Sequence, residues 1–281
     1  MSEEGNFAGA GGVSIRWERH TSAGPPRGVV LIAHGYAEHL GRYRDFVAHL
    51  TGRGLAVAGI EHRGHGRSGG PRGHCGSLDE LAADLRTLAD LTEEWWPRVP
   101  RLLFGHSLGG LLAVIYLLRH PDTVRAAALS APAVRVPDVA PRALRPIGAL
   151  LGRIAPRVGF RSNLDATLLA RDPAVGAAYV ADPLVHRRAS AGFLRAMRQA
   201  QAEAFAEAPR VRVPVLVLQG DADRIVDPAG AQDLAARLAG PHELVMLPGY
   251  FHELLNEPEP DRAAVLALLE RWFDRWLASP A

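Results

Sequence analysis

Residues 101–119 read RLLFGHSLGGLLAVIYLLR. The apolar run at 101–106 is typical of a short buried strand, and the longer run at 107–120 is typical of a buried helix. The turn between them carries the pentapeptide Gly105-His106-Ser107-Leu108-Gly109. Its two glycines let strand and helix approach closely, so Ser107 is expected to stand above the sheet as a nucleophile. The five letters alone are also compatible with a merely structural glycine-rich turn.

The backbone around this turn is suited to negative charge. Ser107 would lie at a helix N-terminus, where free N–H groups and the helix dipole stabilise a developing oxyanion. The Leu108 N–H is the natural first donor. A second strand candidate ends in His34-Gly35-Tyr36, and the Tyr36 N–H is the candidate second donor. His34 is expected to brace this loop rather than perform chemistry.

Further short apolar runs repeat the strand pattern at 29–34, 55–60, 125–130 and 214–219. Segments with helical spacing lie between them, most clearly at 78–91. This alternation predicts an α/β protein with a mostly parallel, doubly wound sheet. Residues 14–18 are expected to add an antiparallel leading strand, 243–247 a late strand, and 259–277 a closing amphipathic helix.

The alternation fails between residues 132 and 210, where prolines punctuate Leu-, Ala- and Arg-rich helical pieces. We therefore predict a core formed by 1–131 and 211–281, with 132–210 inserted as a helical cap. One helical face of the insertion carries Leu144, Ile147, Leu151, Ile154 and Val158, and the opposite face carries Arg142, Arg145, Arg153 and Arg157. The apolar face is expected to pack onto the core, with transient contact to a membrane surface as the alternative.

Composition excludes several classes of protein. The 281 residues are 48% hydrophobic and carry a net charge of only +2, which is no basis for nucleic-acid binding. No apolar run approaches the roughly 18 residues of a membrane span. The N-terminal segment lacks the features of a secretory signal, so a cytoplasmic location is expected. Cys75 is the only cysteine, which excludes an intrachain disulfide.

A serine nucleophile requires a histidine base that a carboxylate orients, and on this kind of sheet they follow in the order Ser, acid, His. Asp221, Asp223 and Asp227 follow the strand candidate at 214–219. Asp227 precedes Pro228 and is better explained as a helix N-cap. Asp221 and Asp223 both remain candidates for the acid. Of the 12 histidines, His252 follows a late strand and a Pro-Gly turn, which makes it the candidate base.

The histidines of EHRGHGRSGGPRGH suggest a metal site at first sight, because imidazole is a common zinc ligand. His62, His65 and His74 have no nearby acid or cysteine that completes a familiar ligand spacing. We therefore expect neither a metal nor an organic cofactor.

Five phrases taken together resemble the monoacylglycerol lipase and lysophospholipase branch of the α/β-hydrolases: HGYAEHLGRY, EHRGHGRSGG, FGHSLGG, LVLQGDADRIVDP and FHELLNEP. The resemblance extends from about residue 29 to 258, and the set is far more specific than any one phrase. It implies the α/β-hydrolase fold, with a catalytic triad of Ser107, Asp223 and His252. It also implies an oxyanion hole from Tyr36 and Leu108, and a lid over an acyl tunnel.

The resemblance further implies that Glu38 and Arg42 shape a polar pocket for a glycerol head group. On residue chemistry alone, their spacing is also compatible with an exposed i, i+4 surface pair, and the polar-pocket role is the one we favour. The sequence departs from the family at Leu255, where animal members carry a further histidine, and at Glu61, where Asp is usual. The first change bears on substrate preference, and the second on bracing of a loop.

The expected reaction is hydrolysis of a monoacylglycerol to glycerol and a fatty acid through an acyl-enzyme on Ser107. The substrate partner is a small lipid ester. A lysophospholipase, a general carboxylesterase and an acyl transferase would use the same residues. A non-catalytic binding protein on the same scaffold is the alternative of a different class.

Overall fold

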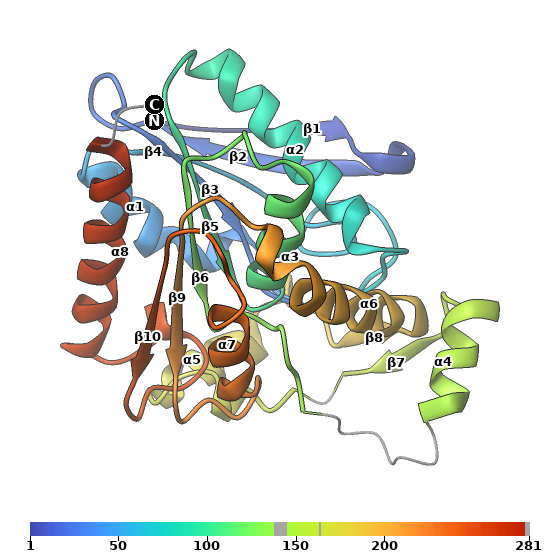
Figure 1. Ribbon diagram of the computed structural model, residues 1–281. Coiled ribbons are helices and arrows are strands. Elements are labelled where there is room, and N and C mark those ends of the chain that lie inside the picture. Colours follow the sequence, from blue (N-terminus) through green and yellow to red (C-terminus); the bar gives the residue numbers. More distant parts are fainter. Residues whose placement is uncertain (138–144, 163, 279–281) are drawn as a thin grey trace.

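The computed structural model describes residues 1–137, 145–162 and 164–278, and its centre is an eight-stranded sheet (Figure 1). The strand order is β1-β2-β4-β3-β5-β6-β9-β10. β1 pairs antiparallel with β2, and β2 with β4, while all later neighbours are parallel. The strands are β1 Ser2–Ala8, β2 Ser14–His20, β3 Val29–Ala33, β4 Ala56–Ile60, β5 Arg101–His106, β6 Ala126–Ser130, β9 Val215–Gly220 and β10 His242–Leu247. The predicted mostly parallel sheet is confirmed.

Helices cover both faces of this sheet (Figure 1). The larger hydrophobic cluster joins one face to α2 (Leu78–Trp95), α3 (Leu108–Arg119) and α6 (Ala191–Glu207). A second cluster joins the other face to α1 (Arg44–Gly52) and the closing helix α8 (Asp261–Ala278). The short helix α7 (Pro228–Ala235) follows β9. Because the strands are buried on both faces, their sequences are continuous apolar runs.

Strand β1 was not predicted from the sequence. Its residues SEEGNFA show no apolar alternation, and four of the seven side chains are polar or charged. The strand is held by its full antiparallel ladder to β2 and by cross-strand ion pairs, Arg16 to Glu4 and Arg19 to Glu3. An edge strand of this kind is stabilised by its partner more than by its own pattern.

Most of the segment between β6 and β9 lies beyond the carboxyl ends of the parallel strands, while its last helix, α6, packs beside α3 (Figure 1). It contains α4 (Arg145–Ile154), β7 (Gly159–Arg161), α5 (Pro173–Ala181), β8 (Arg188–Ser190) and α6. β7 and β8 form a separate two-stranded sheet. Helix α6 buries a stripe of alanines, Ala196, Ala200, Ala204 and Ala208 at its end, in the same cluster as α2 and α3.

The apolar face expected to pack onto the core does not do so over its described part. Ile154 is 70% exposed and Val158 is 42% exposed, while Leu151 is half-buried. Helix α4 contacts α6 alongside it, which leaves its outer side in solvent. Leu144 and Arg142 lie outside the described residues. Within those residues, no helix combines the length and apolar character needed to cross a membrane.

Candidate active site

Ser107 lies on a strained turn between β5 and α3, with φ 52° and ψ −113°. A positive φ at a non-glycine residue is unfavourable and is typical of functional positions. The flanking glycines permit it: a Cβ on Gly109 would lie 1.9 Å from the Ala33 carbonyl oxygen, and one on Gly105 would lie 2.3 Å from the Gly109 carbonyl oxygen. Backbone contact this close explains why both positions are glycine.

His252 and Asp223 come together from the loops after β10 and β9. The His252 Nδ1 lies 2.7 Å from Asp223 Oδ2, and both side chains are buried. Asp223 Oδ1 accepts the N–H groups of Ile225 at 2.8 Å and Val226 at 3.0 Å, and Gln219 Nε2 donates to Oδ2 at 3.1 Å. Burial alone would raise the pKa of Asp223, but His252 and the two backbone donors lower it. The carboxylate is therefore held ionised in one orientation.

The other two carboxylates of this loop have structural partners. Asp227 caps α7 by accepting the Ala229 N–H at 3.0 Å, which confirms the predicted N-cap. Asp221 accepts the Gly249 N–H at 2.6 Å and so links the loops after β9 and β10. Of the three candidates, Asp223 is the one whose carboxylate bonds to the His252 ring.

His106 joins the serine turn to the histidine loop. Its ring lies 4.9 Å, centroid to centroid, from the ring of His252. Its Nδ1 donates to the Ser130 carbonyl at 3.1 Å, and the Ser107 N–H donates to the same carbonyl at 2.9 Å. Burial is the main reason that the pKa of His106 falls to about 4, so this ring stays neutral at physiological pH.

The loop after β3 lies beside the serine turn. The carbonyl groups of Ala33 and His34, where this loop begins, lie directly against the backbone of Gly109. Neither the Tyr36 nor the Leu108 N–H donates a hydrogen bond to a described backbone or side-chain group. Both N–H groups are therefore available for an oxyanion. His34 is wholly buried, with Nδ1 bonded to the Gly35 carbonyl and Nε2 accepting the His62 N–H at 2.9 Å. Its bracing role is confirmed.

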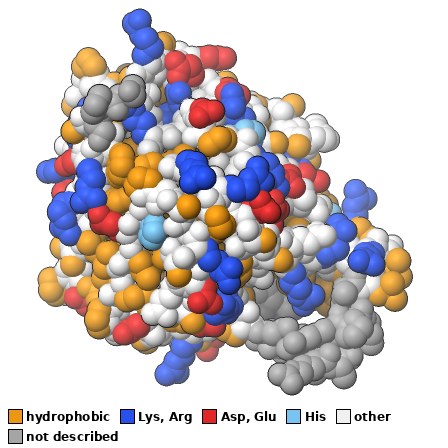
Figure 2. Space-filling model, viewed as in Figure 1, with side chains coloured by type: hydrophobic (Ala, Val, Ile, Leu, Met, Phe, Trp, Pro, Cys, Tyr) orange, Lys and Arg blue, Asp and Glu red, His pale blue; other side chains and the backbone are white. Residues whose placement is uncertain are grey.

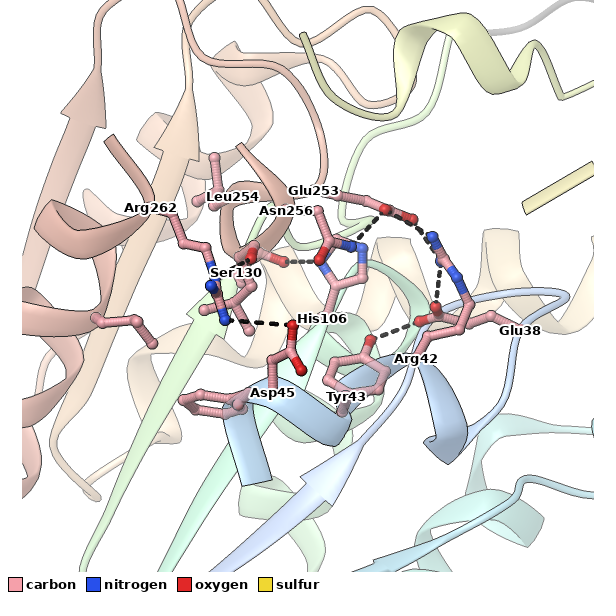
Figure 3. A pocket seen from close by; sticks show the side chains of 13 residues that line it. Glu38, Arg42, Tyr43, Asp45, His106, Ser130, Glu253, Leu254, Asn256 and Arg262 are labelled. Carbon is pink, nitrogen blue, oxygen red and sulfur yellow. Dashed lines mark hydrogen bonds and ion pairs between the residues drawn. The ribbon is translucent and has the colours of Figure 1, made fainter. Parts of the chain in front are cut away.

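Glu38 and Arg42 are not an exposed surface pair. Glu38 is buried, and its Oε2 accepts Arg42 Nη1 at 2.6 Å (Figure 3). Arg42 also makes a bidentate contact with Glu253, at 2.5 and 2.8 Å. The three side chains line a small cavity of about 30 Å³ together with Tyr43, Asn256 and Arg262.

Sequence reasoning missed Glu253. The residue directly follows His252 in the phrase FHELLNEP, and that adjacency is the signal that was available. Leu255, where the sequence departs from the animal members of the family, has an apolar environment. It packs against the hydrophobic cluster that includes α8, and it lines the same cavity as Arg42. Here Glu253, and not a side chain at position 255, makes the contact with Arg42.

His62, His65 and His74 each have a protein partner at one ring nitrogen, and Glu61 has one at Oε2. His62 Nε2 lies 3.1 Å from the His34 carbonyl, His65 Nδ1 lies 3.0 Å from the Arg63 carbonyl, and His74 Nδ1 lies 2.7 Å from Ser190 Oγ. No group of three metal-ligating side chains occurs among residues 1–137, 145–162 and 164–278. Glu61 is buried and accepts the Arg67 N–H, so it braces the loop after β4.

The strand order, the strained serine turn after β5 and the Asp–His pair after β9 and β10 define an α/β-hydrolase. The chain belongs to the family described as serine aminopeptidase, S33, whose model matches residues 24–259. It is 42% identical to a monoacylglycerol lipase of Mycolicibacterium smegmatis, over 91% of this chain and 92% of that one. Human monoglyceride lipase is 28% identical over 91% of this chain and 85% of its own length.

Solved structures agree with this placement. The crystal structure of Paleococcus ferrophilus monoacylglycerol lipase matches with a TM-score of 0.84 and 33% identity, covering 92% of this chain and 98% of that one. The chain is therefore a hydrolase of the monoacylglycerol lipase branch of the α/β-hydrolases.

Proposed function

We propose that this protein hydrolyses monoacylglycerols to glycerol and a fatty acid, with Ser107 as nucleophile, His252 as base and Asp223 as the group that orients the base. The observation that carries the proposal is the 2.7 Å contact between His252 Nδ1 and Asp223 Oδ2, with the His252 ring 4.9 Å from the ring of His106, the residue before Ser107. The similarity to monoacylglycerol lipases supports the substrate class.

The bond to Asp223 keeps the ring proton on Nδ1 and leaves Nε2 of His252 free to accept one. His252 takes the Ser107 proton as the hydroxyl attacks the ester carbonyl, and the N–H groups of Tyr36 and Leu108 stabilise the oxyanion. The protonated imidazole then gives its proton to the leaving glycerol oxygen. Water activated by His252 releases the fatty acid and restores Ser107.

The two ends of the substrate need different surroundings. We place the glycerol head group on the polar side of the site, toward Glu38 and Arg42, but not inside the cavity that these residues line, because its volume of about 30 Å³ has room for only about one or two water molecules. We assign the acyl chain to the cap, 132–210, standing over the core of 1–131 and 211–281. Burial of the chain contributes about 0.8 kcal/mol per methylene, so long acyl groups should be preferred to acetyl.

We also propose that the cap contacts lipid surfaces. Exposed apolar and basic side chains lie together on and just after α4, at the right of the space-filling view (Figure 2). They are Leu150, Ile154, Val158, Phe160, Arg153, Arg157 and Arg161. Such a surface favours binding to anionic membranes. Sedimentation with vesicles containing an anionic lipid should remove the protein from solution, and Ile154→Asp should weaken this without changing turnover of a water-soluble ester.

The test of the main proposal is fatty-acid release from a 1-monoacylglycerol, a lysophospholipid and a short p-nitrophenyl ester, with wild type and Ser107→Ala. Turnover selective for the monoacylglycerol and lost in the variant is expected. Preference for the lysophospholipid would identify the protein as a lysophospholipase. Turnover of the short ester alone would identify it as a general carboxylesterase. Full activity of Ser107→Ala would overturn the nucleophile.

A further inference from the structure

The loop that carries Tyr36 and the loop that carries His252 are joined by a chain of three charged side chains, the buried Glu38 and Glu253 and the partly buried Arg42 between them (Figure 3). We propose that this bridge is a positioning device that fixes the oxyanion loop relative to the catalytic histidine. Glu253 is then a positioning residue for the reaction. The inference rests on the roles proposed above for Tyr36 and His252.

One end of the bridge holds the oxyanion loop. Glu38 Oε1 accepts the N–H of Gly35 at 2.5 Å, one residue before Tyr36, and also accepts the Tyr43 hydroxyl at 2.5 Å. Gly35 has no room for a side chain, because its Cβ would lie 2.7 Å from Glu38 Oε1 and 3.2 Å from His106. A shift of the Glu38 carboxylate would therefore move the backbone that presents the Tyr36 N–H.

The other end holds the histidine loop. Glu253 is covalently next to His252, and its carboxylate accepts both Nη atoms of Arg42. Its Oε2 also accepts Asn256 Nδ2 at 2.8 Å, and its own N–H donates to the Leu169 carbonyl at 2.6 Å. The bidentate contact fixes the direction as well as the distance between the loops, since a guanidinium and a carboxylate meet in one plane.

The single positive charge of Arg42 lies between the two carboxylates of the bridge. Burial opposes the charge on Arg42, yet the facing carboxylates of Glu38 and Glu253 raise its pKa. Burial would likewise raise the pKa of Glu38, but Arg42 and the other donors lower it. Every carboxylate oxygen of the two glutamates already accepts a hydrogen bond. Buried ion pairs add little net stability, so geometry is the property that this arrangement supplies.

The positioning role and a direct role in binding glycerol predict different kinetics. A binding role acts on the Michaelis constant of the monoacylglycerol alone. A positioning role acts on the rate with every ester, because each ester uses the same oxyanion donors and the same base. A displacement of about 1 Å can reduce the rate about 100-fold.

The experiment uses Glu253→Gln and Arg42→Lys in the full chain. In Glu253→Gln, an amide N–H₂ must face either Arg42 Nη1 or the donors Arg42 Nη2 and Asn256. Arg42→Lys keeps the charge and loses the planar fork. The matched control is Asp84→Asn, which breaks a buried bidentate pair between Asp84 of α2 and Arg63 of the loop after β4.

We expect kcat of both bridge variants to fall about 10- to 100-fold on the monoacylglycerol and on a p-nitrophenyl ester alike, with KM changed less than about twofold. Labelling of Ser107 by a fluorophosphonate should slow by a similar factor. Asp84→Asn should lower the melting temperature and leave kcat of the folded enzyme near that of wild type.

Two results would overturn the positioning role. One is a raised KM for the monoacylglycerol with unchanged p-nitrophenyl turnover, which assigns the side chains to glycerol. The other is unchanged kcat and labelling per folded molecule. If wild type cleaves the p-nitrophenyl ester but no monoacylglycerol, the proposed substrate is wrong. The positioning role of the bridge is then still tested by kcat on the p-nitrophenyl ester and by the rate of Ser107 labelling.

Discussion

Replacing Asp223 by Asn tests the arrangement of the site most directly. The two oxygens of Asp223 have different neighbours: Oδ1 accepts two backbone N–H groups, and Oδ2 faces His252 Nδ1 and Gln219 Nε2. An asparagine has one oxygen and one N–H₂ group, so one of these positions must receive a donor.

The backbone donors decide which position receives it. An N–H₂ group at the Oδ1 position would face the fixed N–H groups of Ile225 and Val226 and lose two hydrogen bonds, at about 1–3 kcal/mol for each group left unpaired. An N–H₂ group at the Oδ2 position would instead donate to His252 Nδ1 and meet only Gln219, whose side chain can rotate. The second orientation is favoured, and it moves the ring proton to Nε2.

An imidazole protonated on Nε2 cannot accept the proton of Ser107. We therefore expect kcat of Asp223→Asn to fall by about 10⁴, which corresponds to about 5 kcal/mol of activation free energy, with the fold retained. The assay is p-nitrophenyl ester turnover at neutral pH, with Asp221→Asn as the matched control. The reasoning is refuted if Asp223→Asn keeps more than about a tenth of the activity while Asp221→Asn loses it.

Two further predictions concern stability. In Gly109→Ala the new Cβ would lie 1.9 Å from a β3 carbonyl oxygen, so we expect the free energy of unfolding to fall by about 3 kcal/mol or more. The control is Gly52→Ala, whose new Cβ would have no atom within 4 Å and should leave stability unchanged. Equal melting temperatures of the two variants would contradict this reasoning. Burial holds the pKa values of His34, His62 and His65 well below the ordinary value. Below pH about 6.5 these rings take up protons when the chain unfolds, which favours the unfolded state. The free energy of unfolding therefore has its full value above that pH. Below it, the free energy of unfolding falls by up to about 1.4 kcal/mol per pH unit for each ring. Urea midpoints from pH 7 to 5 should record this fall, with a shallower slope in His62→Gln, and a flat profile would exclude it.

The predictable part of the fold is the part encoded by contiguous residues. Strand β5 and helix α3 begin and end within one residue of the predicted boundaries, because a buried strand and helix on either side of two glycines leave few other arrangements. The strand β1 was missed for the opposite reason, since its stability resides in the ladder to β2. The wrong expectation for Ile154 has the same origin: an apolar stripe shows that a face is apolar and does not show what covers it.

The residues of the candidate site also differ in whether local sequence or distant contacts identify them. Motif position was sufficient to nominate Ser107 and His252, while the choice of Asp223 over Asp221 rested on family resemblance. The hydrogen bond to the His252 ring now gives that choice a physical reason. Glu253 was not predicted, because its partner Arg42 is 211 residues away in the chain, and its place next to His252 does not by itself indicate that partner.

Backbone strain points to the same region without any reference to motifs. Besides Arg98, the non-glycine residues with positive φ in the described chain are Ala37, Ser107 and Ala131, at 67°, 52° and 46°. Each follows the carboxyl end of a parallel strand, β3, β5 or β6, within four residues. Such conformations cost about 1–3 kcal/mol each and persist only where surrounding contacts enforce them. Three of them at one edge of one sheet mean that packing elsewhere in the molecule holds this edge in a fixed, unfavourable shape, which is what a preorganised site for a short-lived oxyanion requires.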